Sequence, residues 1–428
     1  MIKIYLVTIF LIVYIFVIFE EFIKIKKSKV TIFGSTIIWI IIFLYFDDKN
    51  FFAIKINECI LDYSELFLFL FVAMIYINTI KSFGLLNNIK IFFLKKKYSY
   101  KKIYWIIGFL SFILSPFADN LTTALIMCSV ILTIEKKDKN FINLSCINIV
   151  IASNAGGVFS PFGDVTTLMI WQKGLLEIKS FLYIFIPAIV TFIVPAFFIS
   201  LNISDNNPII LQKSVNYSNI NKYSITVIFL FVFTIILTAV LQTFLKIPAI
   251  IGMMTGLGFL QLFEYFNNIY NKFDFYVYKQ INKIEWETLI FFYGILLCVG
   301  GLSAVGLLND LAYFFYDKLG EPFIDKYKFL PANILIGLFS SVIDNIPITF
   351  AVINMNINMS EGQWLLVTFT TGVGGSILSI GSAAGIALMC KANKFYTFFS
   401  HLKYTWAILL GYFLGICCHI FLNNTLFI

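Results

Sequence analysis

Long apolar runs, each about as long as a helix that crosses a bilayer, follow one another along almost the whole chain. Roughly 20 apolar residues in a helix cross the hydrocarbon layer once. A soluble fold could not bury a chain of 428 residues that is 60% hydrophobic. We therefore predict an all-α polytopic membrane protein. The runs fall at about residues 3–19, 30–46, 63–82, 103–134, 141–171, 181–201, 223–245, 248–266, 287–308, 329–359, 363–390 and 402–422.

The net charge of +8 is basic enough to raise the question of nucleic acid, but the lysines cluster in short loops between apolar runs. That is the positive-inside pattern of membrane proteins, so we expect the lipid bilayer as a partner and no nucleic acid. The seven cysteines are scattered and show no metal-ligand spacing. We expect no cofactor. The first run lacks a small-residue cleavage site and precedes a lysine-rich loop, which favours a membrane helix over a secretory signal.

The basic loops give the spans a direction. Placing Lys24–Lys29, Ile89–Lys102 and Asn271–Lys283 in the cytoplasm orients the spans consistently. The run 103–134 then has lysines at both ends, which predicts a re-entrant hairpin with its tip at Ser115–Asn120.

When the crossings are counted on from these basic loops, the run 329–359 is predicted to be a hairpin that enters from the opposite side, with its tip near Asp344. The runs 141–171 and 363–390 are also too long for one simple crossing and are predicted to be broken helices. Non-helical backbone at membrane depth survives only where protein or water satisfies it, which suits a binding site. Once the two hairpins are set aside, about 10 of the apolar runs remain as full spans.

Matching motifs occur in the two halves of the chain. The first half has SPFADNLTTAL (115–125) and NAGGVFSPFGDVTT (154–167), and the second has SSVIDNIPITF (340–350) and GVGGSILSIGSAAG (372–385). Glu65 precedes Asp119 by 54 residues, and Glu287 precedes Asp344 by 57. Five predicted crossings separate equivalent points, an odd number, so the copies point in opposite directions. We predict an inverted-topology repeat of residues 1–222 and 223–428.

Carboxylates and helix-breaking residues at bilayer depth are costly and mark ion sites. The breaks expose backbone carbonyls beside carboxylates, amides and hydroxyls, the oxygen ligands that hard cations take. Because Asp164 has Ser382 as its counterpart, the predicted site is asymmetric. Candidate ion- or proton-binding residues are Asp119, Asn120, Asn154, Asp164, Thr166, Asp344, Asn345, Ser376 and Ser382. Candidate backbone positions at the breaks are Gly156, Gly157, Gly163, Gly374, Gly375 and Gly381, and candidate proton-relay residues are Glu65 and Glu287.

Structural roles compete with these functional ones. Asp119 and Asp344 suit helix caps, and Asp164 suits a helix N-terminus. The asparagine, threonine and serine side chains can satisfy freed backbone groups, the glycines allow close packing, and the two glutamates suit interfacial anchors. His401 is expected in a loop and His419 as a packed polar group.

The charge at the breaks favours a cation as the cargo. They contain three aspartates, no lysine falls in the middle of them, and arginine is absent from the chain. A carboxylate shielded from water can hold a proton near neutral pH and exchange it for a metal ion. A cation-coupled carboxylate or oxyanion transporter stays open as the alternative, weakened by the absence of cationic side chains. No nucleophile with its base and no HExxH or GxGD signature is present, so we expect no enzyme.

The strings DNLTTAL, NAGGVFSPFGDVTTLMIW, VIDNIPITF and GGSILSIGSAAGIALM resemble the signature segments of NhaD-type sodium/proton antiporters, within the ion transporter superfamily. The likeness covers the chain from about Glu65 onward. It implies a secondary active transporter that exchanges sodium, with lithium as a second candidate, for protons by alternating access. It also implies sodium at the ion-binding residues, an elevator-like movement, a homodimer, and a multi-pass location in the bacterial inner membrane.

Overall fold

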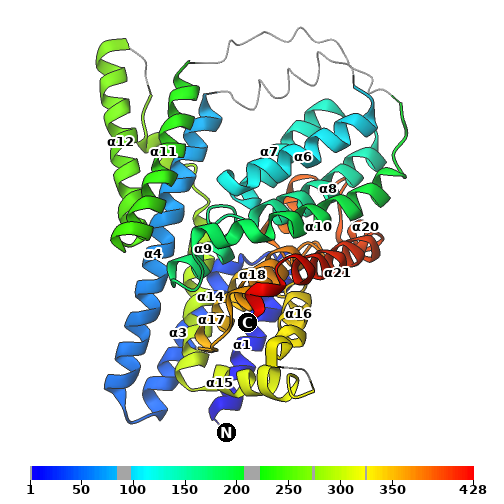
Figure 1. The fold of residues 1–428 in the computed structure, drawn as a ribbon. Coiled ribbons are helices and arrows are strands. Elements are labelled where there is room, and N and C mark those ends of the chain that lie inside the picture. Colours follow the sequence, from blue (N-terminus) through cyan, green and yellow to red (C-terminus); the bar gives the residue numbers. More distant parts are fainter. Residues whose placement is uncertain (1, 84–97, 207–221, 272–274, 323–324) are drawn as a thin grey trace. The chain divides into compact units, whose positions relative to one another are not determined.

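The computed structural model describes residues 2–83, 98–206, 222–271, 275–322 and 325–428. Within these ranges every regular element is a helix (Figure 1), which confirms the predicted all-α class. Residues 89–97 of the predicted basic loop Ile89–Lys102, and residues 272–274 of the loop Asn271–Lys283, lie outside the described residues.

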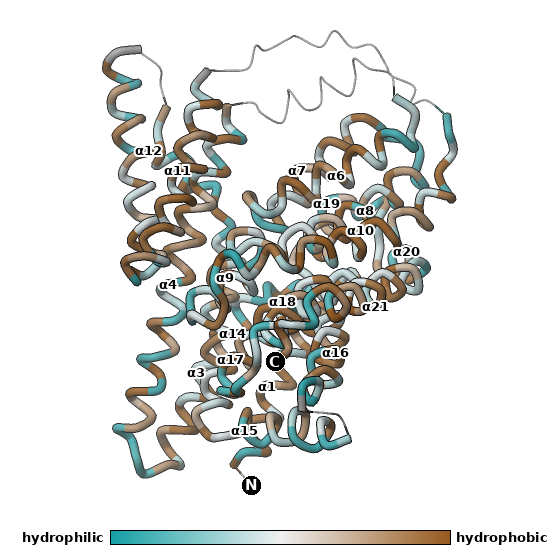
Figure 2. Tube along the Cα trace, viewed as in Figure 1, coloured by the Kyte–Doolittle hydropathy of each residue, from teal (hydrophilic) through white to brown (hydrophobic). Residues whose placement is uncertain are grey.

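Eight helices of the described ranges are long and apolar enough to cross a membrane, judged by length and composition. They are α3 (Lys27–Tyr45), α4 (Lys49–Ser82), α6 (Tyr100–Ala118), η1 (Ile178–Ile184) continued by α10 (Phe185–Ser200), α11 (Lys222–Leu245), α12 (Ala249–Asn271), α14 (Trp286–Ala304) and α21 (Thr405–Leu422). Figure 2 shows hydrophobic residues along much of α6 and α11, and more hydrophilic ones along the lower part of α4. The helix α1 (Ile2–Ile18) is apolar but shorter.

The set differs from the predicted spans for clear reasons. The predicted broken helices do not form continuous helices, and α6, predicted as a hairpin arm, is long enough to span by itself. The remaining helices are short: α2 (Glu20–Ile23), α13 (Tyr278–Ile281), α15 (Leu307–Ala312), the π-helix η2 (Tyr313–Lys318), η3 (Asp325–Tyr327), α20 (Phe398–Leu402) and η4 (Asn424–Phe427). The other helices, which flank the predicted breaks, are given with the site.

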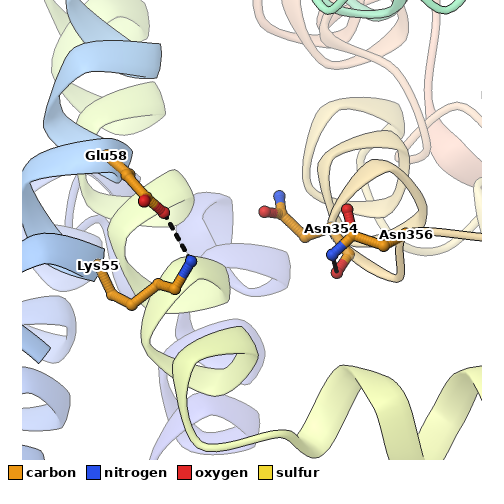
Figure 3. A network of polar contacts seen from close by, with 4 residues as sticks. All are labelled: Lys55, Glu58, Asn354 and Asn356. Atoms are coloured by element: carbon orange, nitrogen blue, oxygen red, sulfur yellow. Dashed lines mark hydrogen bonds and ion pairs between the residues drawn. The ribbon is translucent and has the colours of Figure 1, made fainter. Parts of the chain in front are cut away.

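Helix α4 begins earlier than its apolar run at residues 63–82. It contains 34 residues, about 51 Å at 1.5 Å per residue, and this exceeds a hydrocarbon layer of about 30 Å. Its first part is polar, and Lys55 Nζ pairs with Glu58 Oε2 at 2.8 Å one turn along the same helix (Figure 3). A helix of this kind continues beyond the apolar segment because its polar side chains tolerate water.

The chain forms two compact units. Unit 1 consists of Met1–Asn78, Ile236–Ile324 and Thr349–Asn358, and unit 2 consists of Thr79–Ile235, Asp325–Ile348 and Met359–Ile428. Both units take residues from both halves of the sequence, so they describe a different division from the predicted repeats 1–222 and 223–428. The repeat boundary stays a prediction.

In unit 1, helix α3 packs against both α1 and α14 around an apolar core that contains Leu6, Ile38 and Leu302. Trp39 Nε1 donates to the carbonyl oxygen of Leu297 at 3.0 Å and ties α3 to α14. Gly294 on α14 lies against the backbone of Thr31, where a Cβ would not fit. Unit 1 is therefore held by close apolar helix packing.

In unit 2, packing joins α6 to a helix that starts at Lys139, and joins α10 to α21. Tyr104 Oη on α6 donates to the carbonyl oxygen of Ala196 on α10 at 3.1 Å. All the predicted ion-binding residues and all the predicted backbone glycines belong to this unit.

Candidate ion-binding site

The first hairpin breaks at Asp119. Helix α6 ends at Ala118 and α7 (Asn120–Ile134) begins directly after this residue. Asp119 has a left-handed φ of 53°, and its carboxylate caps α7 by accepting hydrogen bonds from Thr122 N at 2.8 Å and Thr122 Oγ1 at 2.9 Å. A positive φ at a non-glycine residue costs energy and persists where the surroundings enforce it. The predicted tip at residues 115–120 is thus a real break.

The open ends of α6 and α7 meet at the other end of this hairpin. Tyr100 Oη, in the first turn of α6, donates to Glu135 Oε2, directly after α7. Glu135 Oε1 accepts from the backbone N–H of Lys136 at 2.8 Å and of Lys137 at 2.7 Å. The two helices are therefore the arms of one hairpin, as predicted. Its re-entrant course in a membrane stays a prediction.

The first broken helix is interrupted between Gly157, where α8 (Lys139–Gly157) ends, and Val165, where α9 (Val165–Gln172) begins. Asp164 caps α9 and accepts from Thr166 N at 3.2 Å. Ser160 Oγ donates to the carbonyl oxygen of Pro116 at 3.0 Å, so this break lies against the first hairpin near its tip. The predicted break is confirmed.

The second half contains the corresponding interruptions. Helices α16 (Leu330–Phe339) and α17 (Asn345–Asn354) have 10 residues each, about 15 Å, which is too short to cross a bilayer. Asp344 accepts from Ile346 N at 3.4 Å at the start of α17. Helix α18 (Glu361–Gly374) stops before α19 (Ala383–Lys391), and Ser382 caps α19 by accepting from Gly385 N at 3.2 Å.

The glycines at the breaks allow the backbone to approach other backbone closely. A Cβ on Gly156 would collide with the carbonyl group of Phe112 on α6, and a Cβ on Gly374 would collide with that of Gly337 on α16. A Cβ on Gly157 would lie 2.7 Å from the Gly163 oxygen, and one on Gly375 would lie 2.8 Å from the Gly381 oxygen. The contacts are matched in kind between the halves, and they confirm the close-packing role of these glycines.

Asp164 is the centre of a buried polar network. Its Oδ2 accepts from Asn120 Nδ2 at 2.9 Å and from Asn345 Nδ2 at 3.0 Å. Asn120 also donates to Asn154 Oδ1 at 3.1 Å, and Asn154 Nδ2 donates to Ser382 Oγ at 3.1 Å. Each of these five side chains belongs to a residue that is at most 7% exposed. The structure thus brings residues from both hairpins and both broken helices to one carboxylate.

All the hydrogen bonds that Asp164 is seen to accept come from neutral groups, namely two side-chain amides and the N–H of Thr166. Asp119 and Asp344 lie near enough to act on the Asp164 charge. The described residues nevertheless include no group of three or more His, Cys, Asp or Glu side chains close enough to hold a metal ion. The network therefore surrounds one ionisable group, Asp164, with neutral amides and a hydroxyl.

Two further predicted site residues are Thr166, which follows Asp164 at the start of α9, and Ser376, which follows the end of α18. The buried Thr166 hydroxyl makes no hydrogen bond of good geometry within the described residues, but it lies close enough to the Asp164 carboxylate to act on it. Ser376 Oγ donates to the carbonyl oxygen of Val373 at 2.6 Å, so it satisfies the end of α18. Thr166 therefore places a hydroxyl oxygen next to Asp164.

Glu65 and Glu287 belong to unit 1. Glu65 lies within α4, and Glu287 lies in the first turn of α14, where its Oε2 accepts from Ser28 Oγ at 2.8 Å. Their role as a proton relay stays a prediction.

The expectation for His401 was wrong. It lies in the short helix α20, not in a loop, and its side chain is fully buried. His401 Nε2 is 2.9 Å from the carbonyl oxygen of Ser376, at the second break. Sequence reasoning missed this because a five-residue helix has too few positions to show a buried face. His419 is buried within α21, as expected.

Comparison with known proteins identifies the same family that the sequence motifs resemble. The Citrate transporter family matches residues 1–372 of the chain. The Na(+)/H(+) antiporter NhaD of Alkalimonas amylolytica is 41% identical over 98% of this chain and 91% of its own length. The protein of the same name from Vibrio cholerae is 41% identical over the same shares. Sodium/proton antiporter 1 of Arabidopsis thaliana is 28% identical over 95% of this chain and 70% of its own length.

These relatives are transporters, and none of their names describes an enzyme. Bacterial relatives of nearly full length, together with the candidate spans, make the chain a multi-pass protein of the bacterial inner membrane. The chain belongs to the Citrate transporter family and to the NhaD sodium/proton antiporters.

Proposed function

We propose that the chain exchanges sodium for protons and that Asp164 is the group for which the two ions compete. The observation that supports this best is the buried carboxylate of Asp164, which receives amide donors from both hairpins. A carboxylate in such a place binds either a proton or a cation, because an unpaired charge there is costly.

The neighbouring residues fit sodium as the cargo. Hard cations prefer oxygen ligands, and around one carboxylate the network offers amide oxygens of Asn120, Asn154 and Asn345 and hydroxyls of Thr166 and Ser382. Asn120 and Asn345 here turn their nitrogen atoms toward Asp164. Sodium binding would require these amides to rotate and present oxygen. In this proposal the amides stabilise the negative carboxylate between the departure of one ion and the arrival of the next.

Asp119, Asp344 and Ser376 would contribute through the breaks that they belong to. Asp119 caps the return arm of the first hairpin and Asp344 lies at the start of α17, so each orients a break beside the carboxylate. Their charges, near Asp164, would raise the local attraction for any cation. Lithium fits the same oxygen ligands and is the second candidate ion.

The matched interruptions and glycine contacts support two copies of one unit, and we propose that they are inverted relative to each other. If each copy can adopt the conformation of the other, the Asp164 site would open first to one side of the membrane and then to the other. An elevator-like movement and a homodimer belong to the same proposal. Cross-linking of the purified protein in detergent tests the dimer.

A second candidate function is cation-coupled transport of a carboxylate, favoured by the match to the Citrate transporter family. A carboxylate cargo would need donors at the site, and the asparagine amides and the helix N-termini could supply them. The acidic charge of Asp164 and its neighbours opposes it. The sodium/proton reading therefore explains more of the site.

Everted membrane vesicles distinguish the two functions. Respiration acidifies the vesicles, and the fluorescence of a pH-sensitive dye then recovers when an added cation drives protons out. We expect recovery on adding sodium or lithium and none on adding a dicarboxylate at constant cation concentration. Recovery with the dicarboxylate alone would establish the second function instead.

A further inference from the structure

Side chains that follow α19 cap the start of the second break. His401 Nε2 lies 2.9 Å from the carbonyl oxygen of Ser376, and Thr405 Oγ1 donates to the carbonyl oxygen of Ile377 at 3.0 Å. Ser376 and Ile377 follow Gly375, the C-cap of α18. The end of a helix leaves carbonyl groups without intrahelical donors. Two adjacent freed carbonyls are thus held by two side chains four positions apart.

The hydrogen bonds of His401 define its tautomer. A carbonyl oxygen can only accept, so Nε2 carries the hydrogen. The His401 ring is fully buried, as is Tyr396, and full burial disfavours a charged imidazolium. In the neutral ring Nδ1 carries no hydrogen, so it accepts from Tyr396 Oη, 2.8 Å away, and each ring nitrogen has a partner. A ring held at both nitrogens cannot rotate without losing a bond, so it fixes the position of the Ser376 carbonyl.

The break that contains Ser376 ends at Ser382, which belongs to the Asp164 network. Ser382 Oγ accepts from Asn154 Nδ2 at 3.1 Å, and Asn154 in turn accepts from Asn120. A displacement at the start of so short a break would move its other end. Ser382 would then lose its position opposite Asn154.

The segment that contains His401 is itself anchored to the first half of the chain. Ser400 Oγ donates to Asn143 Oδ1 on α8 at 2.7 Å. Lys391 Nζ, at the end of α19, donates to the carbonyl oxygen of Leu125 on α7 at 2.8 Å. His401 therefore holds the second break from a fixed support.

We propose that His401 is a positioning residue for the ion site, which acts by fixing the path of the second break so that Ser382 meets Asn154. It touches neither ion. This inference rests on the proposed function, because its consequence is a change in the apparent affinity for sodium.

His419 provides a matched control in the same chain. Its Nε2 lies 3.1 Å from the carbonyl oxygen of Gly362, and its Nδ1 lies 2.9 Å from Asn423 Nδ2. It is as buried as His401, but Gly362 lies in the first turn of α18, at the opposite end of that helix from the break. Loss of either imidazole removes a comparable bond and comparable volume, and only His401 is bonded to the break.

The test compares His401→Phe, His401→Gln and His419→Phe with the wild type in everted vesicles over a range of sodium concentrations. For His401→Phe we expect the apparent KM for sodium to rise about tenfold, the effect of losing roughly one hydrogen bond, with little change in the maximal rate. Gln keeps an N–H donor near the position of Nε2, so His401→Gln should recover most of the wild-type KM. His419→Phe should lower thermal stability in detergent and leave KM unchanged.

Equal KM values for wild type, His401→Phe and His419→Phe would overturn the inference, as would a His401→Gln variant no better than His401→Phe. If His401→Phe does not reach the membrane, Thr405→Val removes the second cap with almost no change in shape. It should raise KM in the same direction, and an unchanged KM would then overturn the inference. A wild-type protein that moves no protons with sodium would refute the proposed function instead.

Discussion

Asn120 and Asn345 direct their side-chain amides at the same oxygen of one carboxylate, Asp164 Oδ2, at 2.9 and 3.0 Å. One amide follows the break in the first hairpin, and the other follows the break before α17. The two breaks are therefore joined through a group that belongs to neither. A change in the charge of Asp164 alters the bonds that hold both breaks, which links ion binding to the arrangement of the helices.

Replacing Asp164 by Asn should abolish sodium-dependent proton movement. The substitution removes the negative charge but keeps an oxygen that can cap α9, as Asp164 does through Thr166 N. The measurement is fluorescence recovery in everted vesicles, with the amount of protein in the membrane determined in parallel. Asp138→Asn is the matched control, because Asp138 caps α8 through Phe141 N at 2.9 Å. Normal exchange by Asp164→Asn would show that the ion site lies elsewhere.

Replacing Asn345 by Ala removes one of the two amide donors to Asp164 Oδ2. A hydrogen bond to a charged group contributes about 1.5–3 kcal/mol, so the ionised carboxylate should become less stable by about that amount. Protons then compete better with sodium, and we expect the pH profile of exchange to move to more alkaline pH. Asn120→Ala should act in the same direction. The two profiles measured at a fixed sodium concentration check this, and an unchanged midpoint in both variants would contradict it.

The helix breaks could be predicted from the sequence, whereas the central carboxylate could not. Asp-Asn pairs inside apolar runs favour an interruption of the helix, so Asp119 and Asp344 marked their breaks. The sequence showed that Asp164, unlike Asp119 and Asp344, has no carboxylate counterpart, but it did not show which aspartate lies at the centre of the site. Only the fold shows that Asp164 accepts both amides while Asp119 caps α7.

Two other differences have the same physical origin. Hydropathy alone would begin this helix at residue 63, but α4 begins at Lys49. Its polar first part is still helical, because a helix needs its backbone hydrogen bonds and not an apolar surface. The burial of His401 depends on helices far away in the sequence. The pattern of apolar residues near each position therefore predicts neither the start of α4 nor the burial of His401.

Gly156→Ala should lower the stability of unit 2. A Cβ at this position meets the backbone carbonyl of Phe112, which cannot move away as a flexible side chain could. Overpacking of this kind costs about 1–3 kcal/mol. The control is Gly258→Ala, because a Cβ on Gly258 in α12 has nothing within 4 Å and alanine suits a helix better than glycine. Thermal unfolding of the two purified variants in detergent should show a clear loss only for Gly156→Ala.

Glu135 should make the first hairpin sensitive to acid. Burial raises the pKa of this carboxyl, but the Tyr100 hydroxyl and the backbone N–H groups of residues 136–138 stabilise the charged form, and the net result is a lowered pKa. A carboxyl whose pKa is lowered in the folded state stabilises it fully above the unfolded pKa of about 4.3. This stabilisation is lost as the pH falls through the lower folded value. Stability should therefore decline below about pH 4 in part because Glu135 becomes protonated.

Glu135→Gln removes this contribution at every pH, so the variant should be less stable than the wild type at pH 7 and should lose less on acidification. Glu58→Gln is the control, since Glu58 forms an exposed pair with Lys55, and such pairs contribute about 0–1 kcal/mol. The measurement is the midpoint of thermal unfolding in detergent at pH 7 and at about pH 3, below the unfolded pKa. Parallel declines of Glu135→Gln and the wild type would mean that other carboxyl groups cause the acid sensitivity. A smaller decline in Glu135→Gln alone would assign it to the bonds that close the hairpin.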